Sequence, residues 1–226
     1  MLAALSDIFT FFLLMSELAF GAASFKEAAF VRAAISPKAQ TAALIIAFMA
    51  GVSEMLGQSV VLVVNRVPLY RFLASLAFTG LTYALTVLTW ATAALAVSPA
   101  TGLGALGPAQ IGAVSGVLAL AFAPRLLGVL SIAPYFGVAL GNALEAWSMA
   151  LAIYGLQIGL DLPLGAAVFC GLTGWFVSYG FRTFFGHALA KPLGRLRHAV
   201  SGSALDRTPQ QIIDDILATL KSEAPK

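Results

Sequence analysis

The sequence predicts an all-α fold: a polytopic bundle of about five transmembrane helices with an amphipathic C-terminal tail helix. Of the 226 residues, 60% are hydrophobic and only 10% are charged, whereas a soluble domain carries roughly 25% charged residues. The apolar residues also gather in runs near the ~20 residues that an α-helix needs to cross a bilayer. These runs are too long, and alternate too little in polarity, for the strands of a β-barrel.

Five such runs are separated by turns rich in proline, glycine or arginine. They cover about residues 41–64, 72–97, 111–133, 138–159 and 164–185. Inside hydrocarbon each backbone polar group must be bonded within the protein, so each run is expected to be a helix. Together they define a predicted membrane domain at 41–185.

The N-terminal segment, 1–40, leaves two interpretations open. Residues 1–25 are apolar with a polar edge. A helix lying in the membrane interface is favoured, because Asp7 and Glu17 would each be unfavourable at membrane depth. The alternative is a sixth span. Residues 26–40 are more polar and are expected to be a connector.

The distribution of lysine and arginine predicts the orientation of the bundle. One side, which holds the 65–71 turn and the C-terminus, carries Arg66, Arg71, Arg182, Lys191, Arg195 and Arg197. The opposite side carries Lys26, Arg32 and Lys38. Basic residues near span ends favour the cytoplasm, so the C-terminus is predicted to be cytoplasmic. The N-terminus then lies outside with five spans and inside with six.

The tail, 186–226, combines a basic stretch with an amphipathic helix. Lys191, Arg195 and Arg197 suit contact with anionic lipid headgroups. Further on, Thr208 and Pro209 have the residue types of an N-cap and a first helical position. The apolar face of the predicted helix consists of Ile213, Ile216, Leu217 and Leu220. This helix either packs on its own membrane domain or the bilayer surface, which is favoured, or docks a partner protein.

One face of the 138–159 run carries small residues at helical spacing. The face consists of Gly141, Ser148, Gly155 and Gly159. In lipid the hydrophobic effect does not drive helices together, and small side chains let their backbones approach closely. This face is therefore predicted to pack against other helices.

Three charged residues, Glu54, Arg125 and Glu145, lie inside the predicted spans. At a rise of ~1.5 Å per residue, all three fall roughly 10–15 Å from the cytoplasmic side. A charge in the membrane normally finds a partner, so we predict an Arg125–Glu145 ion pair, with Glu54 close enough to share the arginine or to be held protonated. A structural network that fixes helix register is favoured, and a path for protons or cations is the alternative.

The sequence contains no convincing catalytic or cofactor-binding motif. Gly102–Gly107 matches the glycine pattern of a dinucleotide site, but it lies between two predicted spans with no strand before it. Both histidines, His187 and His198, lie in the tail, away from any serine in the spans that could act as a nucleophile. We therefore expect no enzyme activity, catalytic residue, metal or cofactor. The net charge of +3 is attributed to membrane topology and not to nucleic-acid binding.

Several short segments carry a resemblance to a known family. They are Leu118–Gly128 with its Pro124-Arg125 pair, the Pro134–Gly137 turn, the helix with Trp147 and the Asn65–Pro68 turn. In these segments and in its hydropathy layout the chain resembles the Yip1-like family of five-span membrane proteins, over about residues 41–185. The resemblance implies a five-helix, non-enzymatic protein of membrane organisation or assembly, and it assigns no residue a role.

The sequence therefore favours a non-enzymatic scaffold, assembly or membrane-organisation subunit. The alternative is a small channel or secondary transporter that uses Glu54, Arg125 and Glu145. The expected partners are the lipid bilayer with its anionic headgroups and other membrane proteins. A bacterial inner membrane and a thylakoid membrane are both consistent with the sequence.

Overall fold

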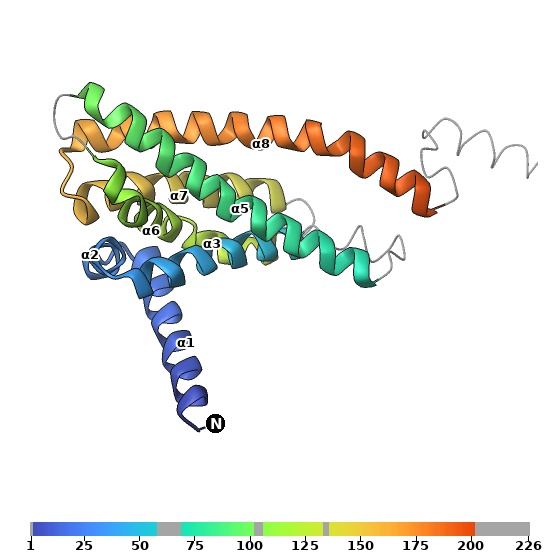
Figure 1. Ribbon diagram of the computed structural model, residues 1–226, viewed down its shortest axis with the longest axis horizontal. Helices are drawn as coiled ribbons and strands as arrows, with labels where there is room; N and C mark the ends of the chain where they lie inside the picture. The colour runs from blue at the N-terminus through green and yellow to red at the C-terminus, as the bar shows by residue number, and fades with distance from the viewer. Residues whose placement is uncertain (1, 58–68, 102–105, 133–135, 202–226) are drawn as a thin grey trace, which may run out of the picture. The chain divides into compact units, whose positions relative to one another are not determined.

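The computed structural model describes residues 2–57, 69–101, 106–132 and 136–201, and every regular element in these ranges is helical. The chain divides into two compact units, Met1–Arg182 and Thr183–Lys226. The α-helices are α1 (Leu2–Ala23), α2 (Glu27–Ile35), α3 (Pro37–Gly57), α5 (Leu69–Val97), α6 (Ile111–Leu120), α7 (Gly137–Gly159) and α8 (Leu164–Ser201) (Figure 1). The 3₁₀ helices are η1 (Ser98–Thr101), η2 (Pro108–Gln110) and η3 (Ala123–Ile132).

Five of the described segments are long and apolar enough to cross a membrane. They are Ser6–Ala23, Pro37–Gly57, Phe72–Ala100, Ile111–Ile132 and Leu164–Phe181. The number agrees with the sequence prediction, but the set differs, because it includes α1 and lacks α7. Asn142, Glu145 and Gln157 are polar residues that lower the hydropathy of α7. The length and composition of α1 make it a candidate for a span, which is the alternative to the favoured interfacial position.

The segment predicted as a polar connector, 26–40, forms the short helix α2 and the start of α3 instead. Phe30 of α2 is completely buried, and its ring stacks edge-to-face on Tyr154 of α7 at 5.6 Å. The turn before α2 is closed by a hydrogen bond from Lys26 N to Gly21 O (2.8 Å) with Phe25 at a φ of 56°. Burial of an aromatic side chain on helices far along the chain explains why this polar stretch is ordered.

The third predicted span, 111–133, is not one continuous α-helix. The α-helix α6 ends at Leu120, and the chain continues as ten residues of 3₁₀ helix in η3. Pro124 explains the position of the break, because a proline ring clashes with the carbonyl four residues earlier, here that of Leu120. The apolar 18-residue stretch of this interrupted segment is the most buried among the five candidates, at 72% against 22–44% for the others. The end of η3 is exposed, at Leu130 and Ile132 for example.

Close backbone packing brings α3 between α5 and η3. A Cβ atom added to Gly51 of α3 would lie 2.8 Å from Thr79 O of α5. A Cβ atom on Gly128 of η3 would lie 3.0 Å from the Cα of Glu54. Ser53 joins the same two elements, since its hydroxyl donates to Leu126 O (2.6 Å) and accepts from Val129 N (3.0 Å). These contacts hold Glu54 directly against η3.

The predicted small-residue face of α7 is used along most of its length. Ser148 and Gly155 are buried, and Cβ atoms on Gly155 and Gly159 would lie within 2.9 Å of Val117 of α6. The prediction for Gly141 is wrong: this residue is exposed, and a Cβ atom there would meet no described atom within 4 Å. The close packing on α6 therefore includes Gly155 and Gly159 but not Gly141.

The C-terminal predictions are described only in part. The last span was expected to end at 185, whereas α8 continues as a helix to Ser201. Lys191, Arg195 and Arg197 therefore lie on this continuation. The predicted apolar face of the tail helix, Ile213, Ile216, Leu217 and Leu220, lies outside the described residues.

The two ends of the α7 face make a matched test of the packing. Valine at Gly155 would place its Cβ 2.7 Å from the fully buried Phe30 ring, and overpacking of this kind lowers stability by about 1–3 kcal/mol. Valine at Gly141 would enter open space and is expected to leave stability nearly unchanged. Thermal unfolding of both variants in detergent measures the difference, and equal melting temperatures would contradict the assigned face.

Candidate functional site

Arg125 lies at the start of η3 and forms ion pairs with carboxylates from two other helices. Its Nη1 atom is 3.2 Å from Oε2 of Glu54 on α3, and its Nη2 atom is 3.4 Å from Oε2 of Glu145 on α7. The pair predicted between Arg125 and Glu145 is thus present, and Glu54 shares the same guanidinium. The three charged residues meet because η3, which begins after the break, packs against both α3 and α7.

Two aromatic residues from further helices join this charged cluster. The hydroxyl of Tyr83 on α5 donates to Oε2 of Glu54 and accepts from Arg125 Nη1 (2.8 Å). The indole Nε1 of Trp175 on α8 donates to Oε1 of Glu145 (3.2 Å). The guanidinium carbon of Arg125 also lies 5.7 Å from the centre of the Tyr83 ring, within the range of a cation–π interaction. The cluster therefore links five elements: α3, α5, η3, α7 and α8.

Burial differs among the charged side chains. Only 8% of the Arg125 side chain is exposed, against 35% for Glu54 and 36% for Glu145. A buried guanidinium is stable only when it is paired and hydrogen-bonded. The cluster meets most of that requirement, because both terminal nitrogens of Arg125 have carboxylate partners. The carboxylates, by contrast, connect the buried arginine with the surface of the helical unit.

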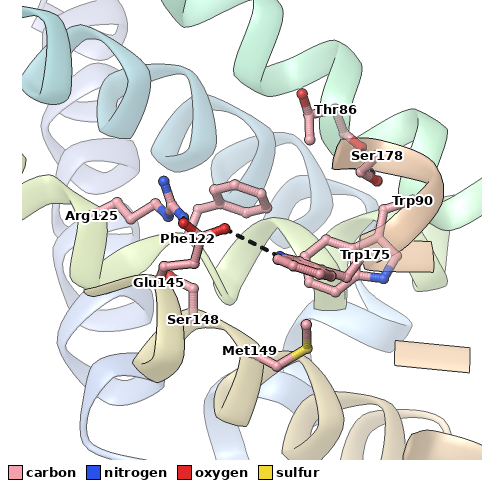
Figure 2. A pocket seen from close by; sticks show the side chains of 9 residues that line it. All are labelled: Thr86, Trp90, Phe122, Arg125, Glu145, Ser148, Met149, Trp175 and Ser178. Atoms are coloured by element: carbon pink, nitrogen blue, oxygen red, sulfur yellow. Dashed lines mark hydrogen bonds and ion pairs between the residues drawn. The ribbon is translucent and has the colours of Figure 1, made fainter. Parts of the chain in front are cut away.

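A small cavity adjoins the charged cluster (Figure 2). Its volume is about 10 Å³, close to the smallest space that holds one water molecule. Its walls come from α5, the break between α6 and η3, α7 and α8. The lining residues are Thr86, Trp90, Phe122, Arg125, Glu145, Ser148, Met149, Trp175 and Ser178. The site is thus a narrow, partly polar space beside an ionic network.

The hydroxyl groups around this cavity are mostly engaged with their own helices. Thr86 donates to Thr82 O (2.7 Å), and Ser178 donates to Gly174 O (2.7 Å). Such bonds satisfy the hydroxyl hydrogens within a helix. None of these groups is paired with a general base of the kind that nucleophilic catalysis requires. Within the described ranges, no three His, Cys, Asp or Glu side chains gather as a metal-binding group.

The sequence identified the charged residues of the site but missed its aromatic ones. Tyr83 lies among the threonines of α5, and Trp175 lies in an apolar part of α8. The signal that could have found them is the depth along each span, since a tyrosine hydroxyl or an indole N–H deep in a membrane helix needs an acceptor.

No family model, curated protein or solved structure matches this chain. The resemblance to the Yip1-like family therefore stays a prediction from sequence.

The buried and exposed ion pairs of the protein allow a matched test of the cluster. Replacing Arg125 by methionine leaves two carboxylates without their cation and is expected to lower stability by about 3 kcal/mol. The Arg32–Glu17 pair is equally short at 3.1 Å, but both side chains are exposed, so Arg32→Met is expected to cost less than about 1 kcal/mol. Denaturant unfolding in mixed micelles measures both values.

A second set of variants separates charge from packing in this test. Adding Glu54→Gln and Glu145→Gln to Arg125→Met removes the uncompensated charges and is expected to restore part of the lost stability. A triple variant that is less stable than Arg125→Met alone would contradict this expectation, and would show that the bonds from Tyr83 and Trp175 stabilise the carboxylates without the arginine.

Proposed function

We propose that this chain is a non-enzymatic integral membrane protein that acts as a scaffold, assembly or membrane-organisation subunit. One observation supports this proposal: a single ionic network joins side chains from five helical elements at the break between α6 and η3. A rigid bundle of this kind presents fixed lipid-facing helices to other membrane proteins. The adjoining cavity, at about 10 Å³, is too small to hold a substrate larger than a water-sized molecule.

The outer faces of the bundle fit a role within the membrane. Large apolar side chains are exposed on α1, α5 and α8, among them Phe12 (63%), Leu73 (54%) and Phe176 (64%). In a membrane these side chains face lipid or another helix, where close van der Waals packing stabilises association. The proposed cytoplasmic side carries the basic stretch with Lys191, Arg195 and Arg197, which adds attraction to anionic headgroups.

Co-purification tests the proposed role most directly. The full chain, extracted from its native membrane in mild detergent, is expected to retain specific membrane proteins that mass spectrometry identifies, and deletion of 208–226 is expected to remove them. Ile216→Ser, on the predicted apolar face, should weaken retention as well, whereas Asp215→Ser should not. Retention that is unaffected by the deletion would contradict a partner-docking role for the tail.

The alternative function, a small channel or secondary transporter, is favoured by a different observation. The backbone of the central segment is broken at the charged cluster, and interrupted helices commonly form ion and substrate sites in transporters. Glu54 and Glu145 are each about one-third exposed, so they offer carboxylate oxygens to a passing proton or cation. In this hypothesis Arg125 holds the two acids in place.

Proteoliposomes that contain a pH-sensitive dye test this alternative. If the cluster conducts protons, an imposed gradient decays faster with the protein than without it, and Glu54→Gln and Glu145→Gln each slow that decay. Glu17→Gln is the matched control, because Glu17 forms an exposed ion pair outside the cluster. Decay that matches empty liposomes, with correctly inserted protein, would exclude proton conduction under these conditions.

A further inference from the structure

Two unsatisfied polar groups belong to residues that line the cavity beside the charged cluster. Among the buried side-chain atoms of the described residues, Arg125 Nε and Ser148 Oγ have no hydrogen-bond partner. Both residues are more than nine-tenths buried, with 7% and 4% exposed, and both line the cavity (Figure 2). Buried polar atoms without a partner are rare in folded proteins, and a bound water is one common explanation.

Size restricts what can fill this space. A volume of about 10 Å³ leaves room for a single water-sized molecule. A phosphate, a lipid headgroup or an amino acid is therefore excluded. The ligand must be water or a monatomic or similarly small ion.

Hydrogen-bond chemistry and charge select among these small ligands. The Nε–H of Arg125 is a donor and cannot be deprotonated, so the ligand must supply an acceptor atom. A sodium, potassium or ammonium ion has none to offer. An anion such as chloride would accept the bond, but it would lie beside Glu145, which also lines the cavity, and like charges repel strongly in a buried site. Water accepts from Arg125 and bonds to a hydroxyl without either conflict.

We propose that the cavity is a binding site for one water molecule, held by Arg125 Nε and Ser148 Oγ. The water accepts a hydrogen bond from the arginine and donates to or accepts from the serine hydroxyl. Thr86 and Ser178 supply further oxygen atoms in the wall, and Trp90, Trp175 and Phe122 form its apolar part. This water completes the partners of the guanidinium and connects η3 with α7. The site does not depend on which membrane process the bundle serves.

Radiolytic labelling with isotopic water tests the proposal on the full-length protein in detergent micelles. A brief X-ray pulse converts ordered water to hydroxyl radical, which oxidises the nearest reactive side chains. Met149 and Trp175 line the cavity and are expected to be oxidised, and ¹⁸O-labelled solvent identifies the oxygen as that of water. Met49 on α3 is 44% exposed on a segment apolar enough to face the micelle, so its labelling is expected to be several-fold lower.

A pair of serine variants makes the assignment specific. Ser148→Ala removes one partner of the water and is expected to lower the labelling of Met149 several-fold. Ser115→Ala is the matched control, since Ser115 is equally buried on α6 but bonds to Gly112 O of its own helix (3.1 Å). Labelling of Met149 and Trp175 no higher than that of Met49, or unchanged labelling in Ser148→Ala, would overturn the proposal.

Discussion

The burial of the Arg125 guanidinium is the constraint on which the arrangement of this protein depends. An unpaired guanidinium inside a helical bundle is too unstable to persist, so acceptors must come to it from neighbouring elements. Glu54 and Glu145 provide them from α3 and α7, and Tyr83 adds a contact from α5. Because each acceptor occupies one position on its helix, these contacts fix the register of three helices around η3.

The interrupted central segment is what makes that geometry possible. A continuous α-helix through 111–133 would satisfy its own backbone, whereas the change to 3₁₀ helix after Leu120 alters the direction in which Arg125 projects. The irregular backbone at the break is tolerated because residues 118–125 around it are buried in protein. Ser53 bonds to it directly, and the close approach of α3 at Gly128 leaves no space for a side chain there. The charged cluster and the break in the helix after Leu120 therefore stabilise each other.

Sequence reasoning reached the charged cluster through a simple geometric argument. Counting depth along antiparallel helices predicts that Arg125, Glu54 and Glu145 lie close together. The two ion pairs of Arg125 show that they do. It did not predict η3, because a proline inside an apolar run is compatible with a kinked continuous helix as well as with the end of a helix. It also missed the burial of Phe30, because helix α2 is stabilised by tertiary contacts that no local pattern encodes. The predicted packing face of α7 extends to Gly141 because the spacing of small residues continues there, but no described atom lies close enough to pack on that residue.

The hydration of the charged cluster connects the two candidate functions. A network that only fixes helix register needs every buried donor to have a partner, and one trapped water at Arg125 Nε is sufficient for that. A conducting site needs more, because its carboxylates must exchange protons with both sides of the membrane. The two glutamates are each about one-third exposed, while only 8% of the arginine side chain between them is exposed. The cavity beside the arginine has room for a single water. This asymmetry favours a rigid, locally hydrated bundle over an open path, and so favours the scaffold role.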